Sequence, residues 1–231
     1  MYRLGKYNAS DRMSDLVCEN YPILLVMSRF GIALGFGDKT IGQVCEQSGV
    51  DTETFLTVVN LLLDEDRSPR AEDYAFSIDA LVSYLRNSHD YFLGFRLPAI
   101  RNKLVEAIDC RSDVSQAILR FYDQYVEEVQ KHMKYEEQVV FPYVRALLED
   151  GDRGGYSIDI FRSRHDQVEA RLNELKNIII KYYPADSGNE LNSVLFDIFT
   201  CARDLASHNY IEDHLFVPSI VELEHQKRGD R

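Results

Sequence analysis

The sequence lacks both a membrane-spanning run and an excess of positive charge. No stretch of about 18 consecutive apolar residues occurs in its 231 residues. Lysine and arginine together number 26, against 38 aspartates and glutamates, which gives a formal net charge of −12. A surface of that sign is poorly suited to nucleic acid or to an anionic membrane. We therefore expect neither as the main partner.

Cysteine is also scarce, and no two cysteines form a C-x-x-C pair. The four cysteines are Cys18, Cys45, Cys110 and Cys201. Scattered single thiols suit a reducing compartment, in which each is a small core residue. Residues 1–7 lack the apolar core of a secretory signal. The sequence thus predicts a cytoplasmic protein.

The chain is long enough for a helical bundle preceded by a small domain. Residues 64–75 are charged, contain Pro69 and show no apolar period, which is typical of a linker. We expect a small helical N-terminal domain over residues 1–66, a linker over 67–75 and a bundle over 76–231.

Two helices in the N-terminal domain are joined by a glycine. Thr40 and Gln43 predict a capping box, Gly49 ends that helix, and Asp51 begins the next. This arrangement also fits a DNA-binding helix-turn-helix. The second helix, however, has several acids and no lysine or arginine before Arg67, so it lacks the cations that hold phosphates. The pattern favours a helical docking module over a DNA reader.

Four long helices are predicted after the linker, over about 77–108, 112–149, 157–182 and 188–226. A loop of glycines and charged residues at 150–155 separates the second from the third, and Ser187 with Glu190 predicts a capping box for the fourth. Pro142 and Pro218 should bend their helices. Short connections between long helices favour an all-α fold, an antiparallel up-down four-helix bundle.

A pattern of histidines and acids occurs twice along the predicted bundle. Each copy has the form H-D, then H-x-x-x-E, and the two histidines are 43 residues apart in both copies. A proline follows ten residues after the second histidine of each copy. A repeat of this kind needs a structural cause. The six residues of the pattern are His89, His132, Glu136, His165, His208 and Glu212.

Residues four apart lie on one face of a helix, so each H-x-x-x-E unit offers an imidazole and a carboxylate to the same point. Bundles build di-iron sites from such inward-pointing side chains, and this ligand set suits iron, manganese or zinc. Two glutamates for four histidines favour two bridged metal ions over one tetrahedral zinc. A single His–Glu pair is also common on a wet surface, but four of the six histidines lie on the repeated frame.

Other polar residues near the pattern have simpler interpretations. His214 and His225 are predicted to be surface histidines, the second near a helix end that favours a cation. Glu137 and Asp213 follow the two glutamates, and Asp90 and Asp166 follow two histidines. They fit either acceptors that fix the imidazole rings or a solvated helix face.

The repeated units, followed by V-F-P or F-V-P and preceded by His-Asp pairs, resemble the hemerythrin-like HHE cation-binding domain. The spacings and the extra N-terminal module are closest to the Repair of Iron Centres di-iron proteins. The resemblance covers about residues 76–226. It implies a non-haem di-iron site whose ligands are His89, His132, Glu136, His165, His208 and Glu212, with the two glutamates as bridges.

The N-terminal stretch is similar to the short domain that precedes the bundle in that family. There, two adjacent cysteines and a glycine follow F-G-I. In this sequence, Phe30, Gly31 and Ile32 are followed by Gly35 and Phe36 at the corresponding positions, so the thiol pair is absent. Roles that depend on those cysteines do not carry over.

The resemblance implies a stress-response protein that restores damaged iron–sulfur clusters and binds O₂, NO or an oxo bridge at a His4Glu2 di-iron site. A client protein with an iron–sulfur cluster would be its partner. The alternative is a metal-dependent gas or redox sensor without turnover, in which the metal state controls how residues 1–66 dock. Loss of the cysteine pair favours this alternative, because gas binding needs no thiol. Iron storage is disfavoured, since two metal ions per chain make no store.

Overall fold

The structure is a computed structural model that describes residues 6–63, 76–109, 112–149, 151, 155–162, 168–183 and 188–228. These residues form helices, and the one β-type pairing among them is an isolated bridge between Arg12 and Thr40. The all-α prediction is therefore confirmed. The predicted linker, Ser187, Cys110 and His165 lie outside the described residues.

Four short helices are found in the described residues 6–63. They are α1 (Met13–Glu19), α2 (Ile23–Arg29), α3 (Ile41–Ser48) and α4 (Thr52–Leu63). The predicted capping box is present, because the Thr40 side chain accepts from the Gln43 amide and the Gln43 side chain accepts from the Thr40 amide. Gly49 ends α3 in the left-handed conformation, with φ of 65°.

Long helical runs follow, each assembled from α-helices and short π-helical segments. The first run is α5 (Ile78–Tyr91), η2 (Phe92–Arg96) and α6 (Leu97–Ala107), and the second is α7 (Asp113–Tyr135), η3 (Glu136–Val140) and α8 (Phe141–Leu148). The last is α11 (Asn189–Ile211), η5 (Glu212–Phe216) and α12 (Val217–Arg228). These three runs agree with the predicted ranges within two residues at each end. In the third predicted range, the structure describes α9 (Asp159–Arg162) and α10 (Val168–Tyr182).

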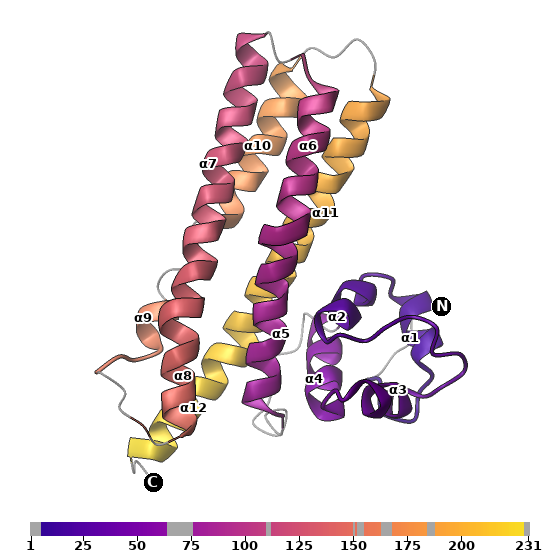
Figure 1. Cartoon of the computed structure of the whole chain (residues 1–231), viewed down its shortest axis with the longest axis vertical. Helices are drawn as coiled ribbons and strands as arrows, with labels where there is room; N and C mark the ends of the chain where they lie inside the picture. Colours follow the sequence, from indigo (N-terminus) through magenta and orange to yellow (C-terminus); the bar gives the residue numbers. More distant parts are fainter. Residues whose placement is uncertain are drawn as a thin grey trace. The chain divides into compact units, whose positions relative to one another are not determined.

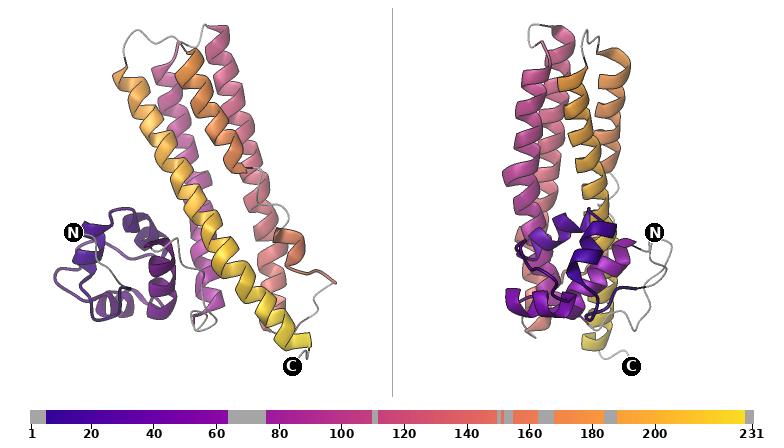
Figure 2. Two further views of the ribbon diagram at one scale, coloured as in Figure 1. Left: turned by 180° about the vertical axis from the view of Figure 1, so that it is seen from behind. Right: turned by 90° about the vertical axis from the view of Figure 1, so that its right-hand side faces the viewer.

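The bundle is held together by an apolar core between α6, α7, α10 and α11, which lie side by side in both figures (Figures 1 and 2). Consecutive helices joined by short connections are antiparallel, as expected for an up-down bundle. The core is built from side chains exposed by 7% or less: Phe92, Leu97, Ile100, Leu104, Ile108, Ile118, Tyr122, Tyr125, Val129, Met133, Leu172, Leu175, Ile179, Leu191, Val194, Ile198, Cys201 and Leu205.

The chain divides into two compact units. One comprises residues 1–88 with 210–219, and the other comprises residues 89–209 with 220–231. The boundaries that the sequence predicts, at 66 and 76, stay a prediction, because residues 64–75 lie outside the described part of the chain.

Each π-helical segment ends two residues before a proline. Pro98, Pro142 and Pro218 stand at the second position of α6, α8 and α12. A proline has no amide hydrogen, and its ring crowds the carbonyl four residues earlier. The helix responds by widening: the residue before each proline donates its amide to the carbonyl five residues back, for example Phe141 to Glu136. The prolines that predicted bends thus coincide with widened turns.

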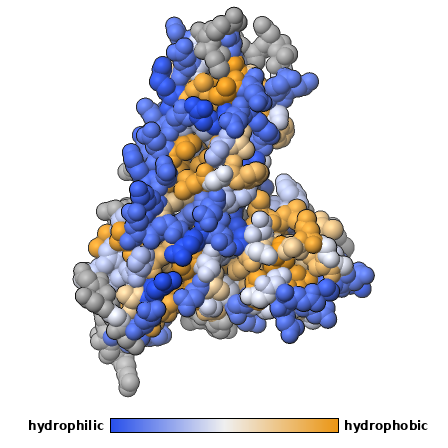
Figure 3. All heavy atoms as spheres, viewed as in Figure 1, coloured by the Kyte–Doolittle hydropathy of each residue, from blue (hydrophilic) through white to orange (hydrophobic). Residues whose placement is uncertain are grey.

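None of the described helices combines the length and the apolarity that a membrane span requires. The viewed face of the long helices carries many hydrophilic residues with apolar ones between them (Figure 3), in keeping with the acidic composition.

Candidate metal centre

The described side chains of the repeated pattern lie within about one helical turn of a change from α-helix to π-helix. His89 lies in the last turn of α5, three residues before η2 begins. Glu136 and Glu212 are the first residues of η3 and η5, and each carbonyl accepts the widened-turn hydrogen bond described above. His208 lies four residues before Glu212 in the same helical run. The widened turns are therefore part of how the sequence presents these side chains.

Four of the predicted ligands form one buried cluster. His89, Glu136, His208 and Glu212 each offer a nitrogen or oxygen atom, and these four atoms all lie within 4.8 Å of one another. Their exposed fractions are 2% for His89 and 0% for the other three. Glu212 is brought to the cluster by its place one helical turn after His208.

Glu136 lies between two histidines. Its Oε2 lies 3.1 Å from Nε2 of His89, and its Oε1 lies 2.9 Å from Nε2 of His132. Burial raises the pKa of the Glu136 carboxyl, but hydrogen bonds from His132 and His89 and their positive charge lower it by more. The pKa of Glu136 consequently lies well below its usual range, which keeps the group a carboxylate.

His89 is oriented by contacts from other helices. Its Nδ1 lies 3.0 Å from Oε1 of Glu137, so that carboxylate fixes one ring nitrogen and leaves Nε2 directed at Glu136. The His89 ring stacks on Phe141 with centroids 5.6 Å apart and meets His208 edge to face at 5.3 Å. These contacts hold the imidazole in one position.

His132 lies beside the four-residue cluster. Its side chain is 12% exposed, it stacks on Phe161 with centroids 6.3 Å apart, and it reaches Oε1 of Glu136. The structure thus brings five of the six predicted residues to one place, four in the cluster and one adjoining it. The sixth, His165, lies outside the described residues.

The chemistry of the cluster fits divalent cations. Two fully buried carboxylates within a few ångströms repel each other and are costly to desolvate unless a positive charge lies between them. Bonds from zinc to imidazole nitrogen or carboxylate oxygen are about 2.0–2.2 Å, so two ligand atoms on opposite sides of one such ion are about 4 Å apart. Separations of up to 4.8 Å require only small side-chain movements to reach that geometry.

Other polar residues near the pattern fall into two groups. Asp90 and Asp213 are exposed, as a solvated helix face predicts, whereas Glu137 contacts His89. His225 is exposed, as predicted. His214 is only partly exposed, because its ring stacks on Tyr210 and its Nδ1 lies 3.0 Å from the Tyr210 carbonyl. The surface interpretation of His214 therefore needs this correction.

The aromatic rings over two of the histidines were missed by the sequence interpretation. Phe141 stacks on His89 and comes directly before Pro142, within the V-F-P motif that the repeat singles out. That position was a usable signal. Phe161 stacks on His132 from the short helix α9, and no spacing rule links the two.

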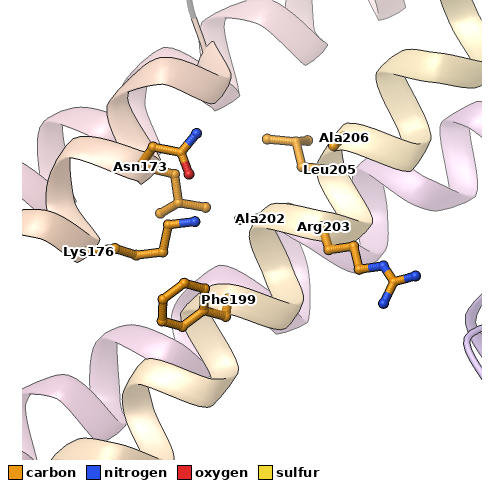
Figure 4. Close-up of a pocket in the computed structure, with 8 residues that line it drawn as sticks. Asn173, Lys176, Phe199, Ala202, Arg203, Leu205 and Ala206 are labelled. Atoms are coloured by element: carbon orange, nitrogen blue, oxygen red, sulfur yellow. The ribbon is translucent and has the colours of Figure 1, made fainter.

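A separate cavity of about 420 Å³ lies between α10 and α11 (Figure 4). Lys176 and Arg203 project at its margin, and the Lys176 ammonium lies 4.6 Å from the centre of the Phe199 ring. Burial lowers the pKa of Lys176. The lining has two cations and neither a carboxylate nor an imidazole, so it offers no set of metal ligands.

Comparison with known protein families identifies the long helices. Residues 79–220 match the family model described as the Hemerythrin HHE cation binding domain, and this range includes every residue of the buried cluster. No curated protein matches the chain.

Proposed function

The chain belongs to the hemerythrin HHE cation-binding domain family, whose model matches more than half of its residues, and from this membership we propose that it is a non-haem di-iron protein. The observation that carries the proposal is the buried cluster of two histidines and two glutamates. Manganese and zinc suit the same ligand types, and bundles with inward-pointing histidines and glutamates hold pairs of iron or manganese ions. We assign iron because the repeated pattern resembles that of the Repair of Iron Centres di-iron proteins.

We assign the ligands as His89, His132, Glu136, His165, His208 and Glu212, with the two glutamates as bridges. The distances from Glu136 to two histidines on different helices support a bridging position for its carboxylate. Glu137 holds the His89 ring, and Phe141 covers one of its faces. The chain thereby supplies oriented ligands in a setting from which water is largely excluded.

Six protein ligands for two irons leave coordination positions at which O₂ or NO can bind. On this basis we propose a role of the Repair of Iron Centres type, in restoring iron–sulfur clusters after nitrosative or oxidative damage. A client protein with an iron–sulfur cluster would then be its partner. This role operates in the cytoplasm, in line with the scattered cysteines.

A second function, metal-dependent sensing without turnover, is favoured by two contacts between α2 and α5. The Asn87 side chain donates a hydrogen bond of 2.7 Å to the carbonyl of Arg29, and the Phe30 ring lies 4.8 Å from that of Tyr84. These contacts join the end of α2 to α5, two residues before His89. A shift of α5 on metal or gas binding would therefore reach the N-terminal helices directly.

Iron analysis tests the di-iron proposal. Protein from iron-replete cells should hold about two irons per chain, as di-iron bundles do. His89→Ala and Glu212→Ala should each lose most of that iron. His225→Ala is the matched control, because His225 is exposed and lies outside the cluster, and it should retain wild-type iron. Well under one iron per chain in the wild type would refute the proposal.

Turnover separates the two functions. For a repair protein, substoichiometric amounts should restore many equivalents of a nitrosylated iron–sulfur enzyme. For a sensor, NO should bind stoichiometrically with a change in the visible spectrum and no repeated repair. In the sensor case, Asn87→Ala should also alter the protease sensitivity of residues 6–63 without changing iron content.

A further inference from the structure

A buried carboxylate outside the metal cluster joins two distant segments of the chain. Glu224 of α12 is only 4% exposed. Its Oε1 accepts hydrogen bonds from the Tyr143 hydroxyl at 2.6 Å and from the Ile158 amide at 2.9 Å, and its Oε2 accepts from the Ser157 hydroxyl at 3.3 Å. Three donors to one buried carboxylate make a strong anchor, because hydrogen bonds to a charged group exceed neutral ones in strength.

The anchor acts at the start of α9. Ile158 comes directly before this helix, and its amide is one of those that a helix start leaves without a partner inside the helix. Glu224 supplies the acceptor. The side chains of Ile158 and Phe161 are both 0% exposed, so the short helix is held by a polar contact at its beginning and by apolar burial along its inner face.

The same short helix carries the ring that covers His132. Phe161 and His132 stack with their planes 18° apart. His132 in turn places Nε2 at 2.9 Å from Oε1 of Glu136. A continuous set of contacts therefore runs from Glu224 through α9 and Phe161 to His132 and the buried cluster.

A second contact supports the position of this segment. The hydroxyls of Tyr156 and Tyr135 are hydrogen bonded at 2.9 Å, and the Tyr156 ring meets Tyr143 edge to face at 4.9 Å. Tyr135 directly precedes Glu136. The segment from Tyr156 to Phe161 is thus fastened to α7, α8 and α12 around His132.

We propose that Glu224 is a positioning residue for the metal centre: by holding residues 156–161 in place, it orients the His132 ring toward the metal. This inference rests on the proposed function, since it assigns His132 as a ligand. It assigns a role at the metal centre to a residue of α12, sixteen positions after His208. Glu224 would act on the metal through residues 156–161 and His132 and not as a ligand.

Two substitutions at Glu224 separate its hydrogen bonds from its charge. Glu224→Leu keeps the approximate volume and removes every acceptor. Glu224→Gln keeps one carbonyl oxygen for Tyr143 and Ile158 and offers its amide to the Ser157 oxygen, so it should restore most of the function. Glu222→Gln is the surface control, because Glu222 is exposed and accepts only from Gln226 among the described residues.

Two measurements report on the metal rather than on folding. The first is the rate at which a chelator removes ferrous iron, and the second is the visible spectrum of the cobalt(II)-substituted protein, which depends on ligand geometry. Glu224→Leu should release iron about tenfold faster, as is typical when a group that orients a ligand is lost, and should change the cobalt spectrum. Glu224→Gln should stay within about threefold of the wild type, and Glu222→Gln should match it.

A loss of stability must be distinguished from a loss of positioning. Leu104→Ala removes a fully buried side chain from α6, about 22 Å along the helical run from His89 at 1.5 Å per residue. It should lower the melting temperature at least as much as Glu224→Leu while leaving iron release and the cobalt spectrum unchanged. If Glu224→Leu does not fold, Phe161→Leu removes the covering ring instead and should change the cobalt spectrum.

The outcomes separate this proposal from the function on which it rests. Suppose that the wild type takes up iron or cobalt, but that Glu224→Leu or Phe161→Leu does not differ from Leu104→Ala in iron release rate and cobalt spectrum. That result overturns the positioning role alone. A wild-type protein that takes up neither iron nor cobalt overturns the proposed function, and the positioning role with it.

Discussion

The apolar core and the ligand cluster of the long helices are buried to a similar extent, but one is lined by apolar side chains and the other by charged and polar ones. On α7, Val129 and Met133 lie in the apolar core with exposed fractions of 1% and 0%, and Glu136, directly after that helix, is also 0% exposed. Apolar burial stabilises the fold by about 25 cal/mol per Å² whether or not an ion is present. A buried carboxylate lowers stability unless a partner compensates for its lost hydration. The apolar core should therefore be indifferent to the cation, and the ligand cluster should depend on it.

The largest effect is expected in the apolar core. Leu175 is 0% exposed, and Leu175→Ala should lower the free energy of unfolding by about 2–5 kcal/mol, because it removes buried methyl groups and leaves a cavity. The loss should be the same for iron-loaded and iron-free protein. Denaturant unfolding of both forms measures it.

The wild type provides the reference for that comparison. Iron at about 100 times its dissociation constant should stabilise the folded protein by about 2.7 kcal/mol. The error of such measurements is on the order of 1 kcal/mol. If the stability that Leu175→Ala loses differs by more than this between iron-loaded and iron-free protein, the core and the cluster are coupled.

The contrast also explains what could be predicted from the sequence. The ends of several helices could be predicted because caps, glycines and charged loops mark them locally, as Thr40, Gln43 and Gly49 do for α3. The pairing of a histidine with a glutamate one turn later could be predicted for the same reason, since both lie on one helix. Such signals need no knowledge of packing.

Which residues meet between helices could not be predicted in this way, although Glu137 was named as a possible acceptor for an imidazole. The partner of the His89 Nδ1 atom is Glu137, 48 residues later, and the ring over His132 comes from Phe161. Neither separation corresponds to a helical period. The widened turns were also missed, because Pro142 indicates a disturbed helix but does not say whether the chain bends or takes up an extra residue.

An intermediate effect is expected at Glu137. Glu137→Gln keeps the size of the side chain and removes the charge that faces His89, so iron affinity should fall about tenfold, at the lower end of the range for groups that orient metal ligands. Because this carboxylate is partly exposed, we expect little change in the unfolding of the iron-free protein. Competition with a chelator measures the affinity.

Glu127→Gln is the matched control for that measurement, since it makes the same change at an exposed position of α7. It should leave iron affinity unchanged. Equal weakening by both substitutions would attribute the effect to net charge, and the contact between Glu137 and His89 would then have no role of its own.

The smallest effect on stability is expected at the prolines that follow the widened turns. Pro142→Ala restores a backbone amide hydrogen. If this amide donates a hydrogen bond to the carbonyl of Gln138, the folded protein is stabilised by about 0.5–1.5 kcal/mol. The substitution also increases the conformational entropy of the unfolded chain, which lowers stability by about 0.4–1 kcal/mol. The two changes nearly offset each other, so iron-free Pro142→Ala should unfold within about 1 kcal/mol of the wild type.

Iron release then tells whether the widened turn serves the ligands. If the turn tightens, the residues that follow it rotate about the helix axis and Phe141 leaves the His89 ring. Iron release should then be faster, by less than about tenfold. Pro98→Ala is the comparison, because η2 begins after His89 and holds no glutamate. It should match Pro142→Ala in stability and the wild type in iron release. Equal release by both variants would mean that the widened turns follow from proline alone and contribute nothing to the ligand geometry.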